Sequence, residues 1–342
     1  MRNHRTRFAF ILVAALTAAC APRLQSAGPF ADDPIEPRLA EHDFITADGL
    51  ELPLRRWLPP VGVELGAVVL ALHGFNDYSN AFAEPAEWLR AHGIAVYAYD
   101  QRGFGAGPEP GMWAGTETLI ADLRAALARL RARHPGVPLY VLGESMGGAV
   151  VIAAWGQEPL DVDGVILAGP AVRGRAVIPF YQSLTLWLTA HSMPWLKVSG
   201  GNLDITPSDN IEMLRALALD PLVIKETRID ALWGLVDLMD RALEAAPEFD
   251  ARALILYGAR DEIIPPPATV EFLDRLPAEN GGRRVAIYLE GYHMLLRDLR
   301  GEVVWRDMAA WMNGSAVPLP SGADQVEAVP LLQECCLSLG DR

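Results

Sequence analysis

The sequence contains little positive charge, little cysteine and no long hydrophobic run. Only two of its 342 residues are lysines, and its formal net charge at pH 7 is −14. A protein with this much negative charge repels the phosphates of DNA and RNA, which excludes nucleic-acid binding as its function. Apolar residues make up 51% of the chain and charged residues 21%, a composition typical of a folded globular protein.

The three cysteines do not provide a disulfide framework. Cys335 and Cys336 are neighbours near the C-terminus, where a bridge between them would be strained. No cluster of cysteine and histidine indicates a metal site, and we expect the protein to need neither a metal nor an organic cofactor. Residues 313–342 contain glycines and prolines without a sustained hydrophobic period, so we expect this tail to be disordered.

The third cysteine, Cys20, ends an N-terminal targeting signal. Three arginines precede an apolar run over residues 8–16, which is too short to span a bilayer. Residues 16–20 resemble a bacterial lipobox, in which the cysteine is lipidated and starts the mature chain. We therefore expect a signal peptide over residues 1–19, a lipidated tether over residues 20–39 and attachment to a membrane of the bacterial cell envelope. A plain secreted protein is the alternative.

Short apolar runs alternate with longer helical segments between about residues 40 and 312. The runs have the length of strands and are apolar on both faces, as buried parallel strands are: residues 67–72, 95–98, 139–142, 165–167, 253–257 and 285–289. The helical segments between them cover residues 84–92, 116–133, 147–155, 268–276 and 302–312. A predicted hairpin at residues 42–57 precedes them. This alternation predicts a doubly wound, mostly parallel α/β sheet.

One long interval breaks the alternation. About eighty residues separate the strand that ends near Ala168 from the strand that starts at Ala253, and they contain two apolar helical segments, residues 178–188 and 229–243. An insertion of this length is typical of a lid or an inserted subdomain. We therefore expect a helical cap at about residues 172–248.

A Gly-Glu-Ser-Met-Gly string occupies residues 143–147, directly after one predicted strand and at the start of a helix. This is the setting of a nucleophile elbow, in which a sharp turn lifts the serine clear of the sheet. The first turn of the helix directs free N–H groups and a positive dipole toward that serine. We therefore expect Ser145 to be a nucleophile. A Gly-rich turn with a buried serine is the alternative.

A nucleophilic serine needs a base to take its proton, and on this fold the base follows the serine in the chain. Only His191 and His293 follow Ser145. His191 lies within the predicted cap, whereas His293 lies on a loop at the carboxyl edge of the sheet, where ligands bind. We expect His293 to be the base and His191 to have a surface or packing role.

The base in turn needs a carboxylate that orients it. Asp261 follows the strand that ends at Tyr257, which places it at the same edge of the sheet as His293. Glu262 is a competitor for this role. Asp298 is a weaker candidate, because we expect it to face outward from a helical turn.

His73, Gly74 and Phe75 follow the first buried strand. We expect the backbone N–H of Phe75 to form an oxyanion hole together with the N–H of Met146. The His73 side chain then has a structural role, because His73 as the base would reverse the chain order that this fold uses.

These strings together resemble the monoglyceride lipase and lysophospholipase group of serine α/β-hydrolases. The resemblance covers about residues 40–312 and is carried by the strings at residues 73–75, 99–105, 143–148, 256–265 and 291–293. It implies an α/β-hydrolase fold with an inserted cap. It also implies these roles: Ser145 as nucleophile, Asp261 as orienting acid, His293 as base, and Phe75 with Met146 as the oxyanion hole.

Two positions depart from the group's pattern, since Glu144 and Phe104 stand where many members carry histidine. Neither position is catalytic, so the reaction class does not depend on them.

The predicted cap is rich in large apolar side chains, but their spacing does not separate an acyl-chain tunnel from the inner packing of a cap. One apolar face of residues 229–243 is expected simply to pack the cap: Leu232, Val236, Met239 and Leu243.

An apolar cap over an ester-cleaving site suits a single-chain lipid better than a charged polymer. We therefore expect a carboxylic ester hydrolase that cleaves monoacylglycerol or lysophospholipid through an acyl-enzyme. An acyltransferase that uses the same triad is the first alternative. A non-catalytic binding protein of the cell envelope is the second, disfavoured because the serine, acid, histidine and oxyanion elements all occur in order.

Overall fold

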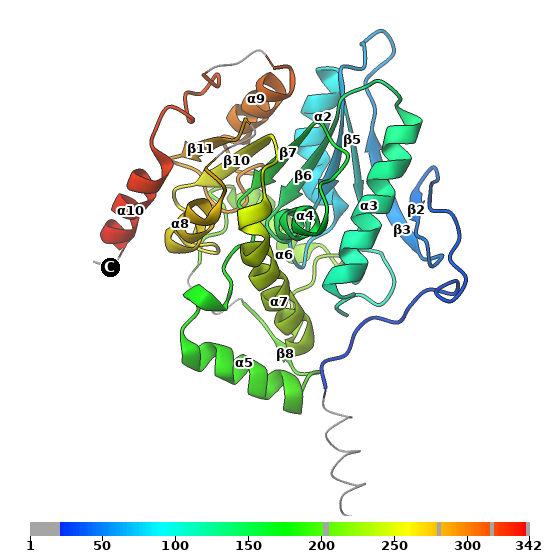
Figure 1. Ribbon diagram of the computed structural model, residues 1–342, viewed down its shortest axis with the longest axis vertical. Coiled ribbons are helices and arrows are strands. Elements are labelled where there is room, and N and C mark those ends of the chain that lie inside the picture. Colours follow the sequence, from blue (N-terminus) through cyan, green and yellow to red (C-terminus); the bar gives the residue numbers. More distant parts are fainter. Residues whose placement is uncertain (1–20, 201–204, 279–281, 315–317, 340–342) are drawn as a thin grey trace, which may run out of the picture.

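A nine-stranded sheet forms the centre of the computed structural model, which describes residues 21–200, 205–278, 282–314 and 318–339 (Figure 1). From one edge to the other its strands are β1 (Arg38–Leu39), β2 (Asp43–Ile45), β3 (Glu51–Trp57), β5 (Ile94–Tyr99), β4 (Ala67–Leu72), β6 (Leu139–Glu144), β7 (Gly164–Ala168), β10 (Ala253–Gly258) and β11 (Arg284–Tyr288). The first three strands pair antiparallel, and β3 is antiparallel to β5. All pairs from β5 to β11 are parallel, so the prediction of a mostly parallel sheet is confirmed.

Helices cover both faces of the sheet, which explains why β4, β5 and β6 are buried along their whole length. One face is covered by α2 (Ala83–Ala91) and α9 (Gly301–Met312). The other is covered by α3 (Thr116–Arg133), α4 (Met146–Gln157) and α8 (Pro266–Arg275). The described residues also contain three short 3₁₀ helices: η1 (Ser79–Phe82), η2 (Arg175–Val177) and η3 (Ala246–Glu248).

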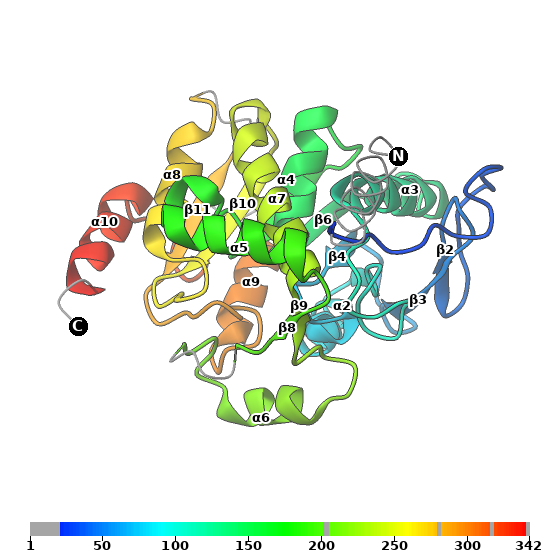
Figure 2. The ribbon, with the colours of Figure 1, turned by 90° about the horizontal axis from the view of Figure 1, so that it is seen from below.

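The interval expected to form a cap, residues 172–248, contains three α-helices and a two-stranded antiparallel sheet (Figure 2). Its elements are α5 (Phe180–Ser192), β8 (Lys197–Val198), α6 (Ile211–Leu219), β9 (Thr227–Arg228) and α7 (Ile229–Ala245). Helix α7 packs so closely on α4 that a Cβ added to Gly156 would lie 2.4 Å from the Cβ of Ala245. Helix α6 was not among the two expected cap helices, and no side chain on it is buried.

Hydrogen bonds attach the middle of the cap to loops that follow strands of the sheet. On one side, the N–H of Ile224 donates to the carbonyl of Asn76 at 2.9 Å, and the Asn76 amide donates to the hydroxyl of Thr227 at 2.6 Å. On the other side, the N–H of Met294 donates to the carbonyl of Pro207 at 2.9 Å. The cap is thus bonded to the loop after β4 and to the loop after β11.

The segment expected to be a tether lies along the domain instead of extending from it. The N–H of Gln25 donates to the carbonyl of Trp113 at 2.7 Å, and the N–H of Gly28 donates to the Asp48 carboxylate at 2.8 Å. Its last residues form β1 and join the edge of the sheet. The expected signal peptide, residues 1–19, and the expected lipidation site, Cys20, lie outside the described residues. No helix among the described residues is both long and apolar enough to cross a bilayer.

The expectation of a disordered tail is wrong for the described part of residues 313–342. The N–H of Ile287 on the edge strand β11 donates to the carbonyl of Ala323 at 3.0 Å, so the tail pairs with the edge of the sheet. Residues Ala328–Leu339 then form helix α10, which packs against α8 and buries Leu332 completely (Figure 1). Burial of an apolar side chain offsets the entropy that ordering the segment costs.

Candidate active site

Ser145 lies on a strained turn between β6 and α4. Its backbone has φ = 52° and ψ = −114°, a left-handed conformation that non-glycine residues rarely adopt. The turn requires glycine on both sides of the serine. A Cβ on Gly143 would lie 2.6 Å from the Cα of Gly148, and a Cβ on Gly147 would lie 2.2 Å from the carbonyl oxygen of Leu72. The spacing of the glycines in the sequence therefore follows from the close packing of this turn.

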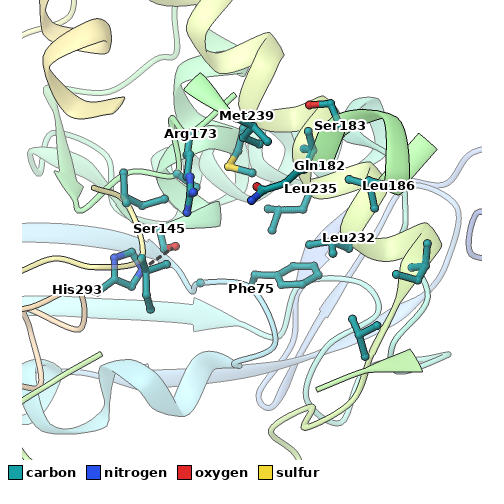
Figure 3. A pocket seen from close by; sticks show the side chains of 18 of the residues that line it. Phe75, Ser145, Arg173, Gln182, Ser183, Leu186, Leu232, Leu235, Met239 and His293 are labelled. Atoms are coloured by element: carbon teal, nitrogen blue, oxygen red, sulfur yellow. Dashed lines mark hydrogen bonds between the residues drawn. The ribbon is translucent and has the colours of Figure 1, made fainter. Parts of the chain in front are cut away.

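The structure brings Ser145, His293 and Asp261 together in one hydrogen-bonded series. The Nε2 atom of His293 lies 3.0 Å from the Oγ of Ser145 (Figure 3). Its Nδ1 atom lies 2.7 Å from an oxygen of Asp261. The other oxygen of Asp261 accepts hydrogen bonds from the N–H groups of Ile263 and Ile264 at 2.9 and 2.8 Å. The carboxylate is therefore fixed, and with Nδ1 protonated the imidazole presents Nε2 as an acceptor for the serine proton.

The environment of His293 makes its imidazole more basic than a free one. Burial lowers the pKa of His293, but the charge of Asp261 and the hydrogen bond from Nδ1 to it oppose burial, and the net pKa is raised. Only the neutral imidazole can take the serine proton. The capacity for proton transfer is therefore present at high pH and lost as the pH falls through the raised pKa.

The competing carboxylates have other partners. Glu262 is exposed and accepts a hydrogen bond from the N–H of Thr206 in the cap at 2.6 Å. Asp298 does not face outward as expected. It is buried, and it accepts hydrogen bonds from the hydroxyl of Ser208 at 2.6 Å and from the N–H of Tyr292 at 2.8 Å. Ser208 comes from the cap, which is why a local pattern did not reveal this burial.

The two other histidines near the predicted site lie away from the serine proton. His191 stacks on Trp187 in the cap helix α5, with ring centroids 4.8 Å apart. His73 is completely buried, and its Nε2 atom accepts a hydrogen bond from the N–H of Gln101 at 2.9 Å. These positions agree with a packing role for His191 and a structural role for His73.

The predicted oxyanion hole lies between the loop after β4 and the start of α4. Among the described residues, the N–H groups of Phe75 and Met146 have no hydrogen-bond acceptor. The Phe75 ring is held in place by Phe104 and Trp113, at centroid distances of 5.5 and 6.4 Å. A Cβ on Gly74 would lie 3.3 Å from the Cβ of Ser145, so the loop passes directly beside the serine.

A cavity of about 800 Å³ lies between the sheet and the cap, with Ser145 and His293 at one end (Figure 3). The cap supplies most of its apolar wall: Ile178, Leu186, Leu232, Leu235, Val236 and Met239. Three residues expected only to pack the cap, at positions 232, 236 and 239, therefore line the cavity. Among the described residues, no group of three or more histidine, cysteine or acidic side chains is placed to hold a metal ion.

The sequence prediction missed several polar residues of the cavity. Arg173 and Gln182 project into it from the cap (Figure 3), and Asp77 and Arg297 line it from the loops after β4 and β11. Of these four residues, Arg297 alone could have been suspected from the sequence, because it follows His293 by four residues. The others reach the site through tertiary packing.

Residues 64–300 match the family described as serine aminopeptidase S33. The chain is 27% identical over 278 residues to the monoacylglycerol lipase of Mycolicibacterium smegmatis, covering 80% of this chain and 96% of that protein. It is 25% identical over 265 residues to the monoglyceride lipase of Homo sapiens, covering 75% and 84%.

Solved structures share the fold. The monoacylglycerol lipase of Paleococcus ferrophilus superposes with a TM-score of 0.64 at 24% identity, covering 78% of this chain and all of that one. A soluble variant of the Saccharomyces cerevisiae monoglyceride lipase, in complex with a substrate analog, gives 0.66 at 21% identity, covering 85% and 100%. The predicted α/β-hydrolase fold is thus confirmed. The chain belongs to the serine aminopeptidase S33 family and is a serine carboxylic ester hydrolase of the monoglyceride lipase-like group.

Proposed function

We propose that the protein hydrolyses esters of single-chain lipids, with monoacylglycerol as the first candidate substrate and lysophospholipid as the second. The observation that carries this proposal is the series Ser145, His293 and Asp261 at one end of a large apolar cavity. Relatives from a bacterium and from mammals are named as lipases of monoacylglycerol, which supports the same substrate class.

The geometry supports an acyl-enzyme mechanism. Ser145 attacks the ester carbonyl while Nε2 of His293 takes the hydroxyl proton, and Asp261 stabilises the imidazolium that forms. The N–H groups of Phe75 and Met146 receive the developing oxyanion. The C–O bond to the alcohol then breaks, and the alcohol leaves with the proton from His293. Water, activated by the same imidazole, attacks the acyl-enzyme and releases the fatty acid.

The charges near the serine favour an ester over an aminopeptidase substrate. A free α-amino group would need an available carboxylate in the cavity. Asp77 is already paired with Arg297 at 2.8 Å, and Glu144 is buried 3.7 Å from the same guanidinium. The guanidinium of Arg297 would repel an ammonium group placed at either carboxylate.

A series of p-nitrophenyl esters and monoacylglycerols of increasing chain length tests the substrate class. We expect kcat/KM to rise by roughly tenfold or more from acetyl to octanoyl esters, because each buried methylene contributes about 0.8 kcal/mol. An aminoacyl p-nitroanilide serves as the peptidase control and is expected to be a poor substrate. A preference for the acetyl ester or for the anilide would contradict the proposal, whereas ester turnover that rises sharply with an added alcohol would favour acyl transfer.

We further propose that the protein is anchored to a membrane of the cell envelope through a lipid on Cys20. The first described residues lie beside the end of α5 (Figures 1 and 2). Four large apolar side chains on α5 are exposed: Phe180, Leu184, Trp187 and Leu188. None of the four lines the cavity. An exposed apolar face near the first described residues supports contact with lipid, and in this proposal the cap faces the membrane.

Replacing Cys20 with serine is expected to move the protein from the membrane fraction to the soluble fraction, because one acylated cysteine supplies most of the attachment. Membrane fractionation followed by immunoblotting measures this change. Cys335→Ser is the matched control and is expected to stay with the membranes. Unchanged membrane attachment of Cys20→Ser would contradict the lipidation proposal.

A further inference from the structure

Two loops and one strand end beside Ser145 each place one charged side chain in a common buried cluster. Asp77 comes from the loop after β4, Glu144 ends β6, and Arg297 lies in the loop after β11. Their exposed fractions are only 5%, 3% and 7%. The Nη2 atom of Arg297 lies 2.8 Å from an oxygen of Asp77 and 3.7 Å from an oxygen of Glu144. A single guanidinium therefore serves two carboxylates.

Glu144 is the unusual member of this cluster. Both of its carboxylate oxygens are buried, and neither accepts a hydrogen bond within the described part of the chain. Removing a charged group from water without hydrogen bonds is costly, so such a group needs a structural or functional reason. It also directly precedes Ser145. The hydrolytic steps derived above do not use it.

We propose that Glu144, Asp77 and Arg297 are positioning residues. They hold the loop of the oxyanion hole, the end of β6 beside the nucleophile and the loop of the base in fixed relative positions. Their net negative charge makes the imidazole of His293 more basic. The inference rests on the proposed roles of Ser145 and His293. Arg297 joins the loop after β11 to the loop after β4 through its bond to Asp77, whose other oxygen accepts a hydrogen bond from the N–H of Tyr78 at 2.8 Å. The cluster thereby links the loop that carries His293 to the loop that carries Phe75.

The charges that face these groups determine the sign of the effect. His293 faces the carboxylates of Asp261 and Glu144 and the guanidinium of Arg297, and both carboxylates raise its pKa while the guanidinium lowers it. Glu144 itself faces Arg297, Asp77, His293 and Asp298. Burial raises the pKa of Glu144, and Arg297 opposes that rise. Removing the negative charge of Glu144 should therefore make the imidazole less basic.

Glu144→Gln tests the electrostatic part, because it keeps the size of the side chain and removes the charge. The readout is the rate at which a fluorophosphonate labels Ser145 as a function of pH, which needs no knowledge of the physiological substrate. We expect the acid limb of this profile to shift to lower pH by roughly 0.5 to 1 unit. Glu302→Gln, on the exposed side of α9, is the matched control and should superimpose on the parent. A Glu144→Gln profile that also superimposes would overturn the proposal.

Arg297→Gln tests the linking part, since it leaves the two buried carboxylates without their shared cation. We expect its labelling rate at the pH optimum to fall at least tenfold, and Arg297→Lys to recover part of that loss. The double variant Glu144→Gln with Arg297→Gln should lose less than the product of the two single effects, because one uncompensated charge is gone. Circular dichroism identifies any variant that does not fold. A folded Arg297→Gln that labels at the parent rate would refute the linking role, even if the lipid substrate were also wrong.

Discussion

Replacing Ser145 with alanine is expected to lower kcat for ester hydrolysis by on the order of 10⁴-fold or more, because no acyl-enzyme can form without the hydroxyl. The fold should not change. Alanine keeps the Cβ that the left-handed turn already tolerates, and among the described residues the lost hydroxyl is bonded to His293 alone. Steady-state turnover of the preferred p-nitrophenyl ester measures the effect, and a fluorophosphonate should no longer label the protein.

Ser183 provides the matched control for this change. It also lines the cavity, but it lies on α5 and its hydroxyl has no hydrogen-bond partner among the described residues. Ser183→Ala is expected to keep kcat within about threefold of the parent, because its hydroxyl takes no part in the hydrogen-bonded series of Ser145, His293 and Asp261. If Ser145→Ala kept more than a hundredth of the parent kcat, or still formed the adduct, another nucleophile would have to be sought.

Replacing Asp261 with asparagine is expected to lower kcat by roughly 10³- to 10⁴-fold. The amide oxygen can still accept the hydrogen bonds from Ile263 and Ile264, so the loop should keep its conformation. Its NH₂ group then faces Nδ1 of His293 as a donor and favours the tautomer with the proton on Nε2, which cannot accept the serine proton. Loss of the negative charge also lowers the pKa of His293, so the acid limb of the residual activity should move to lower pH.

The neighbouring Glu262 is the control for Asp261, because both follow β10 and both were candidates for the orienting acid. Glu262→Gln should keep nearly all activity, since its exposed carboxylate bonds only to the backbone of Thr206 among the described contacts. A larger loss in Glu262→Gln than in Asp261→Asn would reverse the assignment. The same pH-dependent assay serves both variants.

Much of the fold could be predicted from the sequence because the parallel strands are apolar on both faces. The run at residues 67–72 coincides with β4, and the helix predicted at residues 116–133 coincides with α3. The three residues of the proposed triad could be placed for a similar reason. Each lies shortly after the end of a strand, so chain order and strand ends brought Ser145, Asp261 and His293 to one edge of the sheet.

Features that depend on distant segments could not be predicted in this way. Asp298 is buried by Ser208, which lies ninety residues earlier in the cap. Helix α10 is ordered by packing on α8. The glycines and prolines that precede it indicated disorder, so the burial of Leu332 was not predicted. The cluster around Arg297 unites three loops that are far apart in sequence. Local periodicity carries no information about such pairings.

The bonds from the cap to the two loops of the sheet restrict how a lipid gains access to Ser145. Asn76 holds one side of the cap and Met294 the other, so a rigid swing of the whole cap would drag the oxyanion loop and the loop of His293 with it. Helix α5 is far less constrained, because Ala190 is its only buried side chain among those described. A local displacement of α5 would therefore disturb the catalytic geometry less than a movement of the whole cap would.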